Sequence, residues 1–317
     1  MRFRTPTKRD RLDVFDLYLE KVAHEPALDT DRARDELSRI TNGYSPAMIE
    51  QVCSMALTIA HHDRRLSFSR EDLVEAMTTV ESGTAIGIDY VPEETRAVAI
   101  HEAGHAAAAH VYKQGAESTR LSIRMRGGSL GHHMALERDE RFSSWRSEEV
   151  ANLIWSLGSM AAEHVFYGET SVGVGGDVFA VTMMAGRMVG TAGMGPERIE
   201  LNGNEPMRDE LMRRFERIGV QIMNRSGAGG PGDSEHNPVG AVLRDPDKKR
   251  LAAQLIGQAY VAAYNLVRAN REQIEAIADI LVERKELYGD ELVGLLERSN
   301  LHRPEIDYLD EASWPRQ

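Results

Sequence analysis

The chain has 317 residues, of which 42% are hydrophobic and 28% are charged, a balance typical of soluble globular proteins and long enough for two domains. Its 38 basic and 50 acidic residues give a formal net charge of −12, which argues against nucleic acid as a partner because most of the surface would repel a polyanion. Cys53 is the single cysteine, so an intrachain disulfide and a cysteine-based zinc cluster are excluded. We therefore expect a reducing, cytoplasmic location, and any metal must be held by His, Asp or Glu.

No apolar run of about 18 residues, the length that spans a bilayer, stands out in the sequence. The opening MRFRTPTKRDRLD is too charged for a signal peptide. We therefore expect the chain as given to be soluble.

Four short helices are expected in succession at the start of the chain. The first ends before Pro26 and has its apolar residues at helical spacing, at Leu12, Phe15, Leu19 and Val22. The second covers 31–40. Ser45 then caps a third, apolar helix with Pro46 at its first position, and the fourth, in SFSREDLVEAM, is capped by Ser67 or Ser69. Such a series predicts a small helical bundle.

The glycine-rich segment SGTAIGID predicts a boundary near Ser82 to Asp89. Pro92 begins a long helix that stops near Gly115, and the strand-like runs TRLSIRM and SLGHHMAL then predict a hairpin around Gly127-Gly128. The remainder is helical in pattern, except for NRSGAGGPGDSEHNPVG, which has the composition of a flexible loop. The predicted fold is thus mainly α, a small helical bundle followed by a helical domain with a short β-hairpin.

The long helix carries AIHEAGHAAAAH, which places His101 and His105 four residues apart and so on one helical face. Two imidazoles at this spacing are typical of a zinc site, and Glu102 lies where its carboxylate reaches a water beside the metal without ligating it. Zinc polarises a carbonyl and lowers the pKa of water to about 7, so Glu102 is the candidate general base. A helix without metal is disfavoured, because an unsatisfied buried imidazole costs about 1–3 kcal/mol.

A catalytic zinc needs a third protein ligand, and the pattern HExxHxxGxxH does not supply one, because His110 is one residue short of the required spacing. Asp177 is the favoured candidate, since it follows a glycine-rich approach and begins a helix. Glu163 lies mid-helix and is the alternative, or it orients an imidazole from behind. In the pair His132-His133 only one side chain can face the site, and either is expected to face solvent or a substrate groove.

These motifs resemble those of the FtsH-type ATP-dependent zinc metalloproteases. AIHEAGHAAAAHVY is similar to the zinc helix of that family, and GETSVGVGGDVFAVTMMAGRMVGTAGM resembles the segment whose aspartate, here Asp177, is the third ligand. The first 85 residues resemble the helical lid of AAA+ enzymes. The resemblance implies an AAA+ lid at 1–85, a zinc metallopeptidase domain at 90–300 and a C-terminal tail at 301–317. It covers nearly all of the chain except Asn202 to Asp247, whose role it does not explain.

The sequence contains no GxxxxGK[ST] phosphate loop and no acidic Walker B strand. The resemblance therefore implies that ATP and Mg²⁺ bind only in a longer chain, whose AAA+ core lies upstream of Met1, and that the protein contacts a membrane only through an N-terminal anchor that also lies upstream. The resemblance implies a Zn²⁺-dependent endopeptidase that degrades unfolded or membrane-extracted proteins within a homo-hexamer. Two alternatives are a non-catalytic scaffold or adaptor that keeps the fold, and a stand-alone zinc hydrolase.

Overall fold

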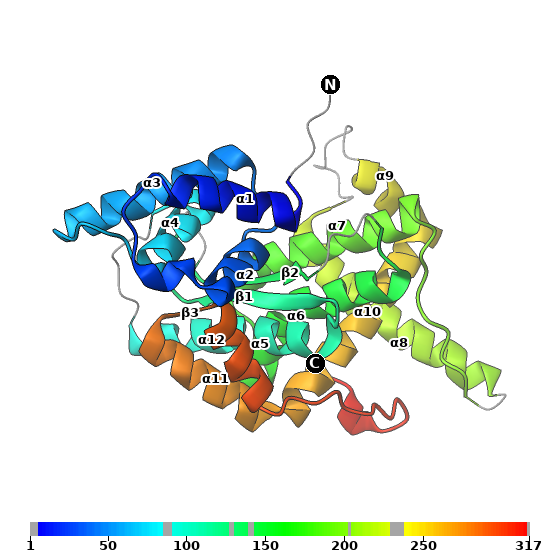
Figure 1. Cartoon of the computed structure of the whole chain (residues 1–317). Helices are drawn as coiled ribbons and strands as arrows, with labels where there is room; N and C mark the ends of the chain where they lie inside the picture. The colour runs from blue at the N-terminus through cyan, green and yellow to red at the C-terminus, as the bar shows by residue number, and fades with distance from the viewer. Residues whose placement is uncertain are drawn as a thin grey trace.

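The structure is a computed structural model that describes residues 6–84, 91–126, 130–138, 143–201, 204–228 and 238–315. Within these ranges α-helices predominate, and the strands form one small sheet (Figure 1). The expected mainly α fold is therefore confirmed. The glycines expected at the hairpin turn and most of the expected loop between 224 and 240 lie outside the described residues.

The N-terminal helices form a bundle with a hydrophobic core of its own, built from side chains between Phe15 and Met77. Ser45 accepts a hydrogen bond from the N–H of Met48, and Ser69 accepts one from Asp72, so each caps the helix that follows it. Of the two caps expected for the fourth helix, the structure has Ser69. The elements are α1 (Lys8–Leu19), η1 (Pro26–Asp29), α2 (Asp31–Ile40), α3 (Pro46–His62) and α4 (Arg70–Ser82).

A second, larger hydrophobic core includes side chains from Val98 to Trp314, so the expected C-terminal tail is partly packed against it. Figure 1 shows the sheet between the N-terminal bundle and the helices α5 and α6. The elements are α5 (Pro92–Tyr112), β1 (Ala116–Ser122), β2 (His132–Glu137), α6 (Arg146–Tyr167), η2 (Val172–Val174), α7 (Gly175–Thr191), α8 (Glu205–Ser226), α9 (Pro238–Arg244), α10 (Pro246–Ala269), α11 (Arg271–Arg284), β3 (Glu286–Tyr288), α12 (Gly289–Arg298) and η3 (Glu311–Ser313).

The expected hairpin is present, because β1 pairs with β2 in antiparallel register. The expectation that everything after it is helical was wrong, since β3 adds a third strand on the other side of β1, giving the order β2-β1-β3. Three residues are too few to display the alternating pattern by which a strand is recognised in a sequence.

One helical segment, Val172–Thr191, is long and apolar enough to cross a membrane by length and composition, contrary to the expectation from sequence. Its valines and methionines keep the mean hydropathy at 1.3 in spite of Asp177 and Arg187. The side chains of Val178, Val181 and Ala185 are buried in the larger core. Because a core helix of a soluble protein passes the same test, the segment is weak evidence for a membrane span.

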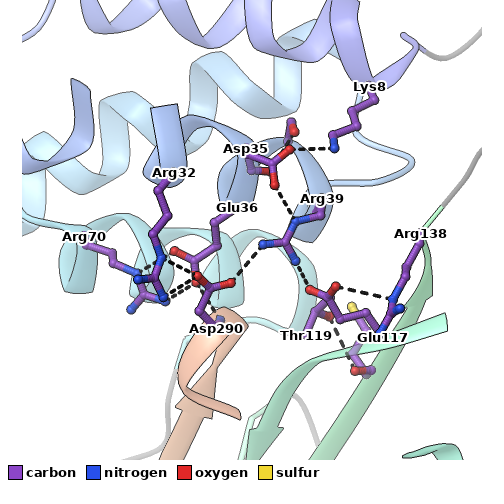
Figure 2. A network of polar contacts seen from close by, with 12 residues as sticks. Lys8, Arg32, Asp35, Glu36, Arg39, Arg70, Glu117, Thr119, Arg138 and Asp290 are labelled. Atoms are coloured by element: carbon purple, nitrogen blue, oxygen red, sulfur yellow. Dashed lines mark hydrogen bonds and ion pairs between the residues drawn. The ribbon is translucent and has the colours of Figure 1, made fainter. Parts of the chain in front are cut away.

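Ion pairs join the N-terminal bundle to the sheet and to α12 (Figure 2). Arg39 of α2 contacts Glu117 of β1 and donates to Oδ1 of Asp290 at 2.9 Å. Beside it, Arg70 of α4 donates to both carboxylate oxygens of Glu36, and Oε1 of Glu36 also accepts the backbone N–H of Asp290. The bundle is thereby attached to β1, a strand of the sheet that packs on α5.

Two glycines let α5 and α6 approach each other closely. A Cβ atom on Gly158 of α6 would lie 2.5 Å from the carbonyl oxygen of Gly104 in α5, and a Cβ on Gly104 would meet the oxygen of Gly158 at the same distance. Both contacts are with backbone, so the helices would have to move apart to accept a methyl group. The glycine of the HEAGH motif is therefore required for the packing that brings α6 to the two histidines.

We expect Gly158→Ala to lower the free energy of unfolding by about 1–3 kcal/mol, because overpacking separates the two helices. Chemical denaturation monitored by circular dichroism measures this. Gly294→Ala is the matched control, since its added Cβ meets only the flexible end of Arg298, at 2.9 Å, and the change should be neutral or stabilising by up to about 1 kcal/mol. Equal stabilities of the two variants would contradict the close helix contact.

Candidate metal centre

Helix α5 presents His101 and His105 on one face, with their ring centroids 5.1 Å apart. The helix forms because alanines, which have the highest helix propensity, surround the motif, and the side chains from Ala106 to Ala109 are buried. Their small size allows neighbouring elements to come close to the two imidazoles. His105 itself is 8% exposed and His101 is half-buried.

Each imidazole is fixed through its Nδ1 atom. Nδ1 of His101 lies 2.7 Å from Oε1 of Glu163, and Nδ1 of His105 lies 2.9 Å from the carbonyl oxygen of Trp155. Both partners are acceptors, so Nδ1 of each ring donates to the protein and Nε2 is the nitrogen left to face the cluster. The Nε2 atoms of the two rings are thereby free to act as ligands.

Asp177 completes the cluster from the first turn of α7. Its Oδ2 atom lies 3.4 Å from Nε2 of His101 and 3.3 Å from Nε2 of His105. The same oxygen accepts a hydrogen bond from the hydroxyl of Ser159 at 2.7 Å. The structure therefore brings together the three side chains that the sequence singled out as candidate metal ligands.

These separations fit a tetrahedral zinc ion. Zn–N and Zn–O bonds of about 2.0–2.1 Å at tetrahedral angles place neighbouring ligand atoms about 3.3–3.4 Å apart. The two distances from Asp177 to His101 and His105 have this value, which is longer than an ordinary hydrogen bond. The donor set of two imidazole nitrogens and one carboxylate oxygen also suits zinc.

The charges in the cluster favour a cation between the three side chains. Burial alone would raise the pKa of Asp177, but the facing His105 and His101 rings outweigh it and lower that pKa. Burial likewise opposes a charge on His101, yet the carboxylates of Asp177 and Glu163 raise its pKa to about 10. A positive charge at this point is therefore stabilised, and a divalent metal ion would supply it.

Glu102 lies next to the first histidine and is 4% exposed. Burial raises its pKa, and the neighbouring His101 and His105 oppose that rise. Gly131, the residue before β2, covers this carboxylate so closely that a Cβ atom on it would lie 2.5 Å from Oε1 of Glu102. Glycine at 131 thus leaves room for the candidate base beside the cluster.

Glu163, the alternative third ligand, has a different position. Its Oε1 accepts from Nδ1 of His101, and it also accepts from the backbone N–H and the hydroxyl of Ser171. With those bonds its carboxylate lies behind the His101 ring, on the side away from Nε2. This arrangement suits orientation of the imidazole.

The remaining histidine candidates lie outside the cluster. His110 is exposed at the end of α5, and His132 is half-buried on β2. The expectation that either member of the pair faces solvent or a groove was wrong for His133, which is 6% exposed and stacks on His105. Burial lowers the pKa of His133 well below its ordinary value, so this ring is neutral.

Sequence reasoning missed two residues of α6 that contact the cluster, Trp155 and Ser159. Together with Glu163 they occupy positions i, i+4 and i+8 of one helix, which places all three on the face that meets α5. That spacing is the signal in the sequence that could have identified them.

Comparison with known proteins bears on the same region. Residues 90–217 match the model of peptidase family M41. The chain is 26% identical over 310 residues to the ATP-dependent zinc metalloprotease FtsH 3 of Symbiobacterium thermophilum, and 29% identical over 300 residues to FtsH 2 of Sphaerobacter thermophilus. It is also 29% identical over 281 residues to the ATP-dependent zinc metalloprotease FtsH of Thermotoga maritima.

These alignments cover 96%, 92% and 88% of the chain but 45%, 42% and 43% of the respective relatives. The chain therefore spans less than half the length of these relatives. The matched family region begins just before α5 and includes α6 and α7, the three helices that supply the cluster.

Proposed function

We propose that this chain is a zinc-dependent endopeptidase acting on unfolded or membrane-extracted polypeptides, because residues 90–217 match the model of peptidase family M41 and the chain is similar to FtsH-type zinc metalloproteases. One observation carries the proposal: Oδ2 of Asp177 lies at tetrahedral edge distances from both His101 Nε2 and His105 Nε2, and the three side chains cluster as possible metal ligands. A buried carboxylate, Glu102, lies directly beside them. This is the arrangement that metal-assisted hydrolysis of a peptide bond requires.

His101, His105 and Asp177 would hold the ion, which when bound polarises the scissile carbonyl and makes water a stronger nucleophile at neutral pH. Glu102 takes the proton from the attacking water and delivers it to the nitrogen of the leaving amine. Glu163 and the carbonyl of Trp155 keep the Nδ1 protons in place, so that both rings present Nε2.

The two alternatives make different demands on the site. A non-catalytic scaffold would tolerate loss of the base or a ligand, whereas Glu102 and the three candidate ligands are all present and clustered. A stand-alone hydrolase would need no nucleotide, and the 317 residues contain no phosphate loop. We propose that any ATP-driven unfolding depends on a nucleotide-binding core that these residues do not include.

The hexamer and the cytoplasmic location also stay predictions. The apolar residues of the helices near the end of the chain, among them Ile274, Ile277 and Leu281 of α11, are buried within the chain. A ring interface would therefore use other surfaces. Val172 and Phe179, which lie on either side of Asp177 in the chain, are exposed apolar side chains that such an interface could bury.

We expect the purified chain to bind about one Zn²⁺ per chain and to cleave unfolded casein. Removal of the metal with 1,10-phenanthroline should stop cleavage, and added zinc should restore it, because the water is activated only when the ion is present. Elemental analysis and electrophoresis of the casein digest measure the two properties. Cleavage that survives complete removal of the metal, or a chain that binds no zinc, would contradict the proposal.

A further inference from the structure

The imidazole of His105 is enclosed by two aromatic side chains that are not candidate ligands. His133 of β2 stacks on it with ring centroids 6.4 Å apart and planes 10° from parallel. Trp155 of α6 meets the same ring at 6.3 Å with the planes at 64°. Two rings packed in different directions restrict His105 to one ring plane.

His133 is held in turn by hydrogen bonds at both nitrogens. Nε1–H of Trp155 donates to Nδ1 of His133 at 2.8 Å, so Nδ1 carries no proton. The neutral ring therefore has its proton on Nε2, which lies 2.9 Å from the hydroxyl oxygen of Ser118 on β1 and donates to it. Because both nitrogens are hydrogen-bonded to the protein, the orientation of the His133 ring beside His105 is fixed.

Trp155 contacts His105 in two ways. Its backbone carbonyl accepts the Nδ1 proton of His105 at 2.9 Å, and its indole packs against the same ring. The indole is itself held by His133 and, on its face, by the ammonium group of Lys113 at 4.0 Å from the ring centroid. A continuous set of contacts thus runs from β1 through β2 and α6 to the metal helix.

We propose that Ser118, His133 and Trp155 are positioning residues whose hydrogen-bonded chain fixes the ring plane of His105 and so directs its Nε2 atom toward Asp177. The inference rests on the proposed function, since it assigns an outer shell to a ligand of the proposed metal. Partners of this kind orient a ligand and typically change metal affinity by about 10–100-fold when they are removed.

Trp155→Phe tests the proposal, because it removes the indole N–H and keeps both an aromatic ring and the backbone carbonyl. We expect the Kd for zinc to rise about 10-fold, measured by competition with a chromogenic chelator. The visible absorption bands of the Co²⁺-loaded chain should also shift, because they report the arrangement of ligands around the metal. Neither readout should move if Trp155 served only to fill space.

Trp145→Phe is the matched control, since this tryptophan precedes the same helix and is 73% exposed. Its Kd for zinc should stay within about twofold of that of the parent chain. Ser118→Ala removes the other end of the hydrogen-bonded chain with a smaller change in volume, so it serves if Trp155→Phe fails to fold. A chain with both Ser118→Ala and Trp155→Phe should show a rise in the Kd for zinc smaller than the product of the two single rises, because each substitution releases the same His133 ring.

A Trp155→Phe chain with the Kd and Co²⁺ spectrum of the parent would overturn the proposal. A parent chain that binds no zinc would instead contradict the proposed function, and the positioning role is then read from histidine side-chain ¹⁵N shifts of the metal-free chain. The proposal would be supported if Nδ1 of His133 carries no proton in the parent and this tautomer is no longer fixed in Trp155→Phe. A proton on Nδ1 of His133 in the parent would overturn it.

Discussion

Replacement of Glu102 by glutamine is expected to lower the rate of casein cleavage by about 10²–10⁴-fold, the usual contribution of a general base, while zinc stays bound. Gly131 packs against Oε1 of Glu102 and leaves no room for a larger side chain. Glutamine has the size of glutamate, so it fits in the same space. Its amide cannot accept a proton from water at neutral pH. Cleavage rate and zinc content measured on the same sample separate loss of the base from loss of the metal.

Glu94→Gln is the matched control for this variant. Glu94 lies in the first turn of the same helix and is exposed, so the substitution makes the same chemical change away from the cluster. We expect it to keep both the zinc and the cleavage rate of the parent. Cleavage retained by the Glu102 variant would place the base on another residue, and loss of zinc from it would mean that the carboxylate contributes to binding the metal.

Local signals explain how much of the fold could be predicted. The third helix begins where Ser45 and Pro46 supply a cap and a first residue with fixed φ, and the second occupies 31–40 as expected. These features act over a few residues, so the sequence displays them directly. Strand β3 is stabilised by pairing with β1 about 165 residues earlier in the chain. Its three residues are too few to show a strand pattern in the sequence, so this pairing could not be predicted.

The candidate site divides in the same way. His101, Glu102 and His105 could be placed together because one helix fixes their spacing. Asp177 and Glu163 could be named as candidates from sequence, but only the packing of α6 and α7 on α5 shows which carboxylate faces Nε2 and which faces Nδ1. The choice between His132 and His133 depends on the register of β2 against β1, which pairs His133 with Leu121 beyond an irregularity near Ser118.

Removal of the Asp177 carboxylate is expected to have the largest effect on the metal. Asp177→Ala should weaken zinc binding by more than about 100-fold, because a direct ligand contributes more than the outer-shell partners, whose loss costs about 10–100-fold. Glu163→Gln should fall in that lower range, since it perturbs the hydrogen bond to Nδ1 of His101 and leaves all three ligand atoms in place. Elemental analysis after dialysis and competition with a chelator measure both variants.

The comparison of the two carboxylates is decisive because the structure assigns them opposite sides of His101. Glu169→Ala, at an exposed glutamate in the segment between α6 and η2, is the control for removal of a nearby negative charge and should bind zinc like the parent. If Glu163→Gln lost zinc and Asp177→Ala kept it, the ligand and the orienting carboxylate would have to be exchanged. If both variants bound zinc like the parent, the metal would have to lie outside the cluster. The 3.3 and 3.4 Å separations between Asp177 and the two histidines would then not reflect a shared ion.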